Sequence, residues 1–326
     1  MRTHHDLLKI LSDGQFHSGE ALGLALGVSR MAIWKHVRAL RTCGVPLEVM
    51  RARGYRLPAA VELLDAGLIR DEVRPVTRER LARIDTFLEI NSTNTWLRQS
   101  ALDGAPSGSV CIAEMQSAGR GRRNRHWVSP FAASLYLSLL WRSASGAAEL
   151  GGLSLAAGVA IVRSLALFGI ASAGLKWPND VLVDGAKLAG ILIDVIGEST
   201  GPCAVIIGIG INVAIPETAA AEIDQNWTDL RRLTGREMLS RNRLAATVLD
   251  HSFAAIGEFE RSGLQPFLEE WRRYDVIQDR HVCLRLPNEI IQGRACGVDS
   301  GGALLVDTAT GRRRFASGEV SLRMTP

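Results

Sequence analysis

The first 60 residues carry apolar positions at the spacing of three short helices. A first helix is predicted up to Asp13, a second from the N-cap Ser18 to Gly27, and a third from the N-cap Ser29. The second helix is expected to turn inward Ala21, Leu22, Leu24 and Ala25. The third is expected to turn inward Ile33, Val37 and Leu40. Short helices joined across such a turn form a helix-turn-helix, in which the last helix contacts DNA.

Residues 46–58 then alternate as two short strands around a basic turn, which is typical of the wing of a winged helix. The predicted DNA contacts are Ser29, Arg30, Trp34, Lys35, Arg38, Arg51 and Arg53. Trp34 is bulky for an exposed position on such a helix, and Ala52 stands where a glycine-rich wing is expected. The alternative interpretation is a small helical dimerisation module with a solvated basic face.

The pattern changes beyond residue 58. Residues 59–69 predict a helix within a linker at 61–75, followed by a large second domain at 76–275. In that domain, strand-like runs at 109–115, 134–141, 189–196 and 203–213 alternate with a helical run at 151–169. Short strands without a helix follow in residues 276–326 and predict a small β-barrel. We therefore expect an α+β protein of several domains, the first being 1–60.

Composition narrows the class of protein only slightly. Hydrophobic residues make up 47% of the chain, which is enough for a sizeable core, and the net charge of +4 weakly favours an anionic partner. The five cysteines are scattered without a CxxC pair, which argues against disulfides and zinc knuckles. The N-terminus lacks the apolar run of a signal peptide, and no stretch is long enough to span a membrane. A reducing cytoplasm is the expected location.

Four short motifs carry candidate chemistry. Residues 119–127, GRGRRNRHW, combine glycines that let a backbone approach a ligand, arginines that bind carboxylate or phosphate, and a tryptophan that can stack on a base. Alternatives are an arginine–glycine RNA-binding patch and a solvated loop. The others are KWPND at 176–180, GIGIN at 208–212, and Ser-Thr-Asn at 92–94. Alone, KWPND is an ordinary turn and residues 92–94 are a helix cap.

Lysine usage adds one clue. Only four of the 38 basic residues are lysines, and two of these, Lys176 and Lys187, lie 11 positions apart. Lysine is a compact point charge, whereas arginine is a broad planar fork. A site that places one positive charge on one oxygen in a tight space therefore favours lysine.

Together these motifs resemble the biotin protein ligases. The resemblance comprises GRGRR followed by Trp127, KWPND, Lys187 seven positions after Asp180, and the GIN strand, all in family order over essentially the whole chain. It implies a central domain like that of class II aminoacyl-tRNA synthetases and a C-terminal SH3-like barrel. It also implies two half-reactions. Biotin and Mg-ATP give biotinyl-5′-AMP, and a lysine of a biotin carboxyl carrier domain then takes the biotin.

The resemblance also implies roles for individual residues. The expected biotin contacts are Ser92, Thr93, Asn94, Gln116, Arg120, Gly121, Arg122, Lys187 and Gly190. The expected contacts to ATP and the adenylate are Arg122, Arg125, Trp127, Asn179, Lys187, Asn212 and Trp227. The expected catalytic residues are Lys187, Arg122 and Asp180. Asp180 would align the incoming lysine or lie near a magnesium ion that arrives with ATP, without a fixed metal site.

The winged helix is similar to that of family members that also repress the biotin-synthesis operon. The implied partners are therefore the carrier domain of acetyl-CoA carboxylase, operator DNA, and a second copy of the chain when the adenylate is bound. Two alternatives stay open. One is a biotin-sensing DNA-binding regulator without catalysis, and the other is a lipoate-type ligase, although lipoate has no ureido ring for the polar residues 92–94 and Gln116.

Overall fold

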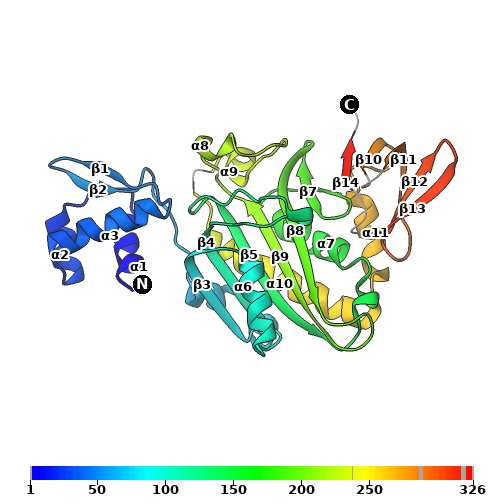
Figure 1. Ribbon diagram of the computed structural model, residues 1–326, viewed down its shortest axis with the longest axis horizontal. Helices are drawn as coiled ribbons and strands as arrows, with labels where there is room; N and C mark the ends of the chain where they lie inside the picture. The colour runs from blue at the N-terminus through cyan, green and yellow to red at the C-terminus, as the bar shows by residue number, and fades with distance from the viewer. Residues whose placement is uncertain (1, 237, 286–288, 317–320, 325–326) are drawn as a thin grey trace.

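The computed structural model describes residues 2–236, 238–285, 289–316 and 321–324. The N-terminal helices and strands are α1 Arg2–Leu11, α2 Gly19–Leu26, α3 Arg30–Thr42, β1 Glu48–Met50 and β2 Gly54–Arg56. The hydroxyls of Ser18 and Ser29 accept hydrogen bonds from backbone N–H groups in the first turns of α2 and α3, so both predicted caps are confirmed. The helix-turn-helix and the β1–β2 hairpin after it form a unit at one end of the molecule (Figure 1).

The predicted apolar side of α2 is wrong in part. Leu22 is buried as expected, but Leu24 is 88% exposed, and Ala21 and Ala25 are exposed as well. The buried stripe instead runs through Gly19, Leu22 and Gly23, because those positions face α3. The inward residues predicted for α3 are all buried.

The predicted helix at 59–69 begins only at α4 Ala66–Glu72, where the Asp65 carboxylate caps the N-terminus. The preceding residues 62–65, which we call the strap, have no regular secondary structure and are held by hydrogen bonds to Asn242 at the start of α10. The Glu62 carboxylate accepts hydrogen bonds from the Ser240 hydroxyl at 2.8 Å and the Asn242 backbone N–H at 3.1 Å. The apolar run that predicts a helix therefore ends in a segment without regular secondary structure that is docked on α10.

A buried ion pair lies beneath the strap. Glu114 on β4 and Arg241 on α10 approach to 2.7 Å, and both side chains are almost completely buried. Glu114 also accepts the Leu64 backbone N–H at 2.6 Å, and Arg241 donates to the Glu62 carbonyl. The strap thus supplies hydrogen-bond partners to both charged groups. A buried ion pair needs such additional hydrogen bonds to offset the loss of water.

A seven-stranded mixed sheet forms the centre of the chain, with the order β3-β4-β5-β9-β8-β7-β6. Only the β3–β4 pair is parallel. Its strands are β3 Arg83–Ile90, β4 Ser109–Gln116, β5 Ser134–Ser143, β6 Gly174–Lys176, β7 Asp180–Val183, β8 Ala186–Ile196 and β9 Cys203–Asn212. The predicted strands at 109–115, 134–141, 189–196 and 203–213 are confirmed, with ends that differ from the observed ones by at most three residues.

Helices cover both faces of this sheet (Figure 1). The helices of this part are α5 Pro75–Arg80, α6 Thr93–Leu102, α7 Leu153–Ala166, α8 Glu217–Ala220, α9 Leu230–Thr234, α10 Arg241–Ser262 and α11 Gln265–Tyr274, with 3-10 turns η1 Arg122–Asn124 and η2 Ala147–Leu150. The large core packs α7 and α10 against one face, and a smaller cluster packs α6 against the other. Because α6 covers only part of its face, the rest of that face can carry a site.

The C-terminal part is a five-stranded antiparallel sheet in the order β13-β12-β11-β10-β14. Its strands are β10 His281–Arg285, β11 Ile290–Val298, β12 Leu304–Thr308, β13 Gly311–Phe315 and β14 Ser321–Met324. The predicted short strands are confirmed; their positions 286–287, 317 and 319–320 lie outside the described residues. Within the described ranges, no helix combines the length and apolar character needed to cross a membrane.

Candidate functional site

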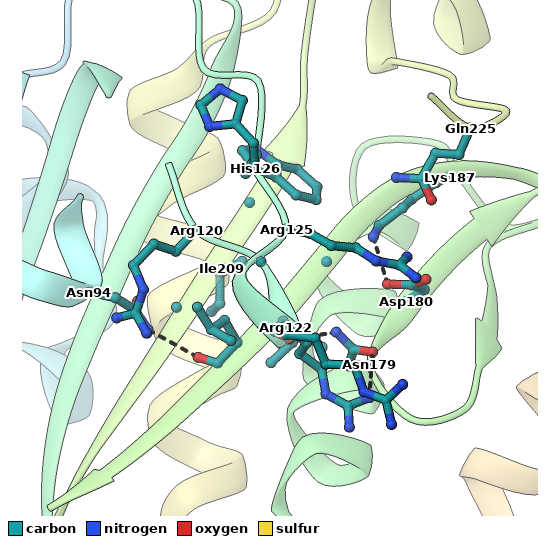
Figure 2. A pocket seen from close by; sticks show the side chains of 18 of the residues that line it. Asn94, Arg120, Arg122, Arg125, His126, Asn179, Asp180, Lys187, Ile209 and Gln225 are labelled. Atoms are coloured by element: carbon teal, nitrogen blue, oxygen red, sulfur yellow. Dashed lines mark hydrogen bonds and ion pairs between the residues drawn. The ribbon is translucent and has the colours of Figure 1, made fainter. Parts of the chain in front are cut away.

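A pocket of about 640 Å³ opens on the sheet face that α6 leaves uncovered. Its floor is formed by β5, β8 and β9, and its walls by the arginine loop (residues 119–127), the turn at 176–180 and the segment 222–226. Figure 2 shows the side chains that converge there. The lining has more positive than negative side chains: Arg120, Arg122, Arg123, Arg125, Lys176 and Lys187 against Asp180, Glu222 and Asp224. An anionic ligand therefore fits this pocket.

The arginine loop folds back on itself. Gly121 N–H donates to the Arg125 carbonyl at 2.7 Å, and Trp127 N–H donates to the Gly119 carbonyl at 2.9 Å. A side chain at Gly119 would place its Cβ 2.3 Å from the Trp127 carbonyl, so this glycine is required where the two legs of the loop meet. The predicted approach of the loop backbone to a ligand stays a prediction. Arg122 lies against Asn179, whose Oδ1 accepts its guanidinium at 3.4 Å (Figure 2). Burial, and then the neighbouring Arg123, lower the pKa of Arg122.

Lys187 and Asp180 form an ion pair within the pocket. The Lys187 Nζ lies 2.8 Å from Asp180 Oδ1, and both side chains are largely buried (Figure 2). Strands β7 and β8, which carry them, are neighbours in the sheet. Nζ also lies 5.1 Å from the centre of the Trp127 ring, within the range of a cation–π contact. The lysine is therefore held by two partners, one from β7 and one from the arginine loop.

Trp127 lies on a floor made of two glycines. Gly190 of β8 and Gly210 of β9 are paired in register, and a Cβ added at either would lie 2.9 or 2.8 Å from the indole ring. Any larger residue at these positions would lift the ring into the pocket. Trp127, the predicted adenylate contact, and Gly190, the predicted biotin contact, both line the pocket, and Gly210 extends the same surface.

The other end of the pocket is polar. Ser92 caps α6, and Thr93 and Asn94 in its first turn are buried. The Ser138 hydroxyl on β5 lies 2.6 Å from Asn94 Oδ1 and 2.8 Å from Thr93 Oγ1. Thr93 N–H donates to Gln116 Oε1 at 2.9 Å. The predicted set 92–94 with Gln116 is thus brought together, and Ser138 completes it.

The sequence interpretation missed two residues of this region, Ser138 and Asp194. Asp194 Oδ2 accepts from Arg120 Nη1 at 3.0 Å and from Asn94 Nδ2 at 3.3 Å. The available signal was the two-residue step along each strand. Asp194 follows the lining residues Gly190 and Leu192 on one face of β8, and Ser138 follows Tyr136 on β5.

Asn179 fixes the turn between β6 and β7, as its predicted place in a turn suggests. Its Nδ2 donates to the Ile191 carbonyl at 2.8 Å, and its own carbonyl accepts the Ile191 N–H. The preceding Trp177 is buried, and its indole N–H donates to the Gly302 carbonyl of the C-terminal sheet at 3.0 Å. The turn is therefore supported from the sheet on one side and from the C-terminal part on the other.

Two predicted nucleotide contacts, Asn212 and Trp227, lie behind the pocket rather than in its lining. The Asn212 amide donates to the backbone carbonyls of Thr228 at 3.0 Å and Lys187 at 3.3 Å. The Trp227 ring stacks with Arg232, whose Cζ lies 4.0 Å from the ring centre, and packs against the small apolar cluster of Ala133, Ile215 and Ala219. Both residues hold segment 226–228 against the Lys187 backbone.

No group of three or more His, Cys, Asp or Glu side chains gathers into a metal site anywhere in the described ranges. In the pocket, Asp180 is already paired with Lys187. The donor set fits a metal ion that enters on a phosphate ligand better than one held by protein side chains alone.

A second candidate interface lies on the winged helix. The predicted contacts Arg30, Trp34, Lys35 and Arg38 are exposed on α3, and the Arg38 guanidinium carbon lies 5.5 Å from the Trp34 ring centre. The two wing arginines, Arg51 and Arg53, are exposed at the β1–β2 turn, where the Arg53 Cζ lies 4.4 Å from the Phe16 ring. Ser29 uses its hydroxyl as the helix cap.

Comparison with known proteins gives matches along the whole chain. The family model described as "Biotin/lipoate A/B protein ligase family" matches residues 87–212, "HTH domain" matches 3–56, and "Biotin protein ligase C terminal domain" matches 279–323. Over 317 residues the chain is 39% identical to the "Bifunctional ligase/repressor BirA" of Salmonella typhimurium, covering 97% of this chain and 96% of that protein. It is 35% identical to the "Biotin--[acetyl-CoA-carboxylase] ligase" of Mycobacterium tuberculosis, covering 77% and 97%.

Among solved structures, a biotin protein ligase from Aquifex aeolicus in complex with biotin and ATP matches with a TM-score of 0.64 at 28% identity. The match covers 75% of this chain and 100% of that one.

Proposed function

The chain belongs to the biotin protein ligase family, and from that premise we propose that it is a bifunctional ligase and repressor. It activates biotin with Mg-ATP to biotinyl-5′-AMP and transfers the biotin to a lysine of a biotin carboxyl carrier domain. With the adenylate bound, it represses biotin synthesis at operator DNA. The observation that carries the proposal is a single pocket with an amide and hydroxyl network at one end and a cluster of cations at the other.

The first half-reaction brings together two anions. The biotin carboxylate attacks the α-phosphorus of ATP, and pyrophosphate leaves. Arg122, Arg125 and Lys187 all line the pocket, where fixed positive charges lower the repulsion between carboxylate and phosphate. Magnesium carried with ATP supplies further charge neutralisation on the phosphates. Lys187 places its charge on the carboxylate oxygen that becomes the acyl oxygen.

The polar end suits the ureido ring of biotin. That ring presents N–H donors and a carbonyl acceptor, and the groups of Ser92, Thr93, Asn94 and Gln116 present both types to the pocket. Lipoate lacks such a ring, and these buried polar groups would then lack ligand partners. This contrast supports biotin over lipoate as the substrate.

The second half-reaction transfers the acyl group. The lysine amine of the carrier domain attacks the acyl carbon, and AMP leaves. Asp180 holds Lys187 at 2.8 Å and is the pocket carboxylate that would align the incoming amine. Arg122, held against Asn179, helps to retain the adenylate beneath the arginine loop until the carrier arrives.

The winged helix is proposed to bind operator DNA as a homodimer of the adenylate-bound protein. The exposed cations of α3 and of the β1–β2 turn support phosphate contacts on both sides of a recognition helix. We further propose that the central sheet has the class II synthetase-like fold and that the C-terminal sheet closes as an SH3-like barrel. The central sheet, in which only β3 and β4 pair in parallel, and the antiparallel C-terminal sheet support this assignment.

One experiment tests the ligase function. The protein is incubated with biotin, Mg-ATP and a carrier domain, and biotinylated carrier is detected with streptavidin. Transfer to the carrier lysine is expected, and no transfer would reject the proposal. ATP–pyrophosphate exchange dependent on biotin distinguishes an active enzyme from a non-catalytic biotin sensor, and competition with lipoate distinguishes the two substrate classes.

A further inference from the structure

Asp194 occupies an unusual place beside the pocket. It follows Gly190 and Leu192 at two-residue steps on one face of β8, but unlike them it lies just beyond the lining. Its side chain is only 17% exposed. One oxygen, Oδ2, accepts hydrogen bonds from Arg120 at 3.0 Å and from Asn94 at 3.3 Å. A single carboxylate therefore joins the arginine loop to the first turn of α6.

The same carboxylate decides which way the Asn94 amide points. An ionised carboxylate only accepts hydrogen bonds, so the amide must turn its Nδ2 toward Asp194 and its carbonyl away. That carbonyl accepts the Ser138 hydroxyl at 2.6 Å. It also fills the space above Gly208, where an added Cβ would lie 2.0 Å from it. Without Asp194, nothing on this side favours the observed orientation except the Leu192 carbonyl, which lies 3.4 Å from Nδ2.

The network continues to the other leg of the arginine loop. From Asn94 it passes through Ser138 and Thr93 to Gln116. The Gln116 amide donates to the Ser129 hydroxyl at 3.0 Å, which in turn donates to the Trp127 carbonyl at 2.7 Å. Both legs of the loop are thus tied to one set of side chains at the polar end of the pocket.

We propose that Asp194 is a positioning residue of the ligase site, which fixes the Asn94 amide for biotin and holds down the Arg120 leg of the arginine loop. The inference rests on the proposed ligase function. Its consequence is that binding of biotin at the polar end and retention of the adenylate under the loop share one anchor. Loss of that anchor impairs both biotin binding and adenylate retention. It leaves the cationic end of the pocket, where ATP is proposed to bind, in place.

The test is Asp194→Asn, which keeps the shape and an acceptor for Asn94 but removes the charge that pairs with Arg120. The rate of adenylate release is expected to rise about tenfold, because Arg120 loses its charged partner. The KM for biotin is expected to rise by a similar factor, because an amide at position 194 can present either its oxygen or its NH2 group and no longer fixes the Asn94 amide. The KM for ATP is expected to stay within about twofold. Glu270→Gln is the matched control, because it removes the charge partner of Arg163, joining α7 to α11 outside the pocket.

A cycle with Arg120→Ala gives a second readout. If Asp194 acts through Arg120, adding Asp194→Asn to Arg120→Ala should change adenylate release by less than about threefold. Unchanged biotin KM and adenylate release in Asp194→Asn would overturn the proposal. So would a fall in melting temperature like that of Glu270→Gln with both kinetic constants intact, because the role would then be structural only. Absence of carrier biotinylation by the wild-type protein would reject the ligase function itself, and this role with it.

Discussion

Replacing Lys187 by arginine keeps the charge and changes only its shape, so it tests the site most sharply. The Lys187 ammonium lies 2.8 Å from Asp180 and 5.1 Å from the centre of the Trp127 ring. Gly190 closes the space from the sheet side, since a Cβ there would lie 3.2 Å from Lys187 Cε. A planar guanidinium does not fit among these walls, and its charge centre must move outward.

The expected cost follows from the displacement. At an effective dielectric constant of about 20, two unit charges attract by about 5.5 kcal/mol at 3 Å and by about 2.8 kcal/mol at 6 Å. Moving the charge outward by about 3 Å thus loses about 3 kcal/mol of interaction with a bound carboxylate, or about a hundredfold in rate. Lys187→Arg is therefore expected to lower biotin-dependent ATP–pyrophosphate exchange by about this factor.

The control is Lys9→Arg, the same exchange at an exposed position on α1, which should leave the rate unchanged. Both variants should unfold at wild-type temperature within a few degrees. If Lys187→Arg retains more than about a third of the exchange rate, the site does not need a compact charge and the electrostatic argument is wrong.

Three further predictions concern other parts of the chain. Arg122→Gly should release adenylate and label bystander lysines at least about tenfold more than wild type, measured by streptavidin blot with an added inert protein; unchanged labelling would contradict the retention role. Burial raises the pKa of Asp275 to about 6, so the folded protein holds this proton more tightly than the unfolded chain does. The protein therefore loses stability as the pH rises from about 4 to about 6. Asp275→Asn should therefore raise the free energy of unfolding by about 3 kcal/mol above pH 7 and not below about pH 4, and a pH-independent effect in urea titrations would refute this. Operator affinity should fall steeply with salt, and Trp34→Ala should lose preference for thymine over uracil at contacted positions, because a thymine methyl is an apolar contact in the major groove; equal discrimination by both proteins in gel-shift titrations would exclude that contact.

Local signals predicted the ends of the N-terminal elements well. Ser18 and Ser29 can satisfy free backbone N–H groups within their own turn, so their effect does not depend on distant contacts. The prediction that Leu24 is buried was wrong, because the buried side of α2 depends on where α3 packs. The spacing of apolar residues within α2 alone does not specify that side. The predicted helix at residues 59–65 was wrong for a similar reason. Their apolar run suits a helix, but Asn242 and Glu114 supply hydrogen bonds to a backbone without regular secondary structure.

The candidate site was predictable where motifs lie in the lining and less so behind it. Lys187, Asp180 and the arginine loop meet in the pocket because the turn chemistry and the strand register bring them there. Ser138 and Asp194 are polar residues flanked by apolar neighbours. The two-residue step along each strand could have indicated that they share a face with lining residues, but the fold was needed to show which face carries the pocket. Asn212 marks the end of β9 as predicted, but its amide donates to the backbone carbonyls of Lys187 and Thr228.

The strap sets where this chain can be shortened. Removing the DNA-binding part by cutting after residue 65 would expose the Arg241–Glu114 pair and strip it of the Glu62 carbonyl and the Leu64 N–H. A cut before Glu62 leaves those contacts whole. A single-function ligase made from this protein, by engineering or by gene loss, would therefore keep residues 62–65 as its new N-terminal segment. In that sense the segment belongs to the enzyme and only the residues before it to the repressor.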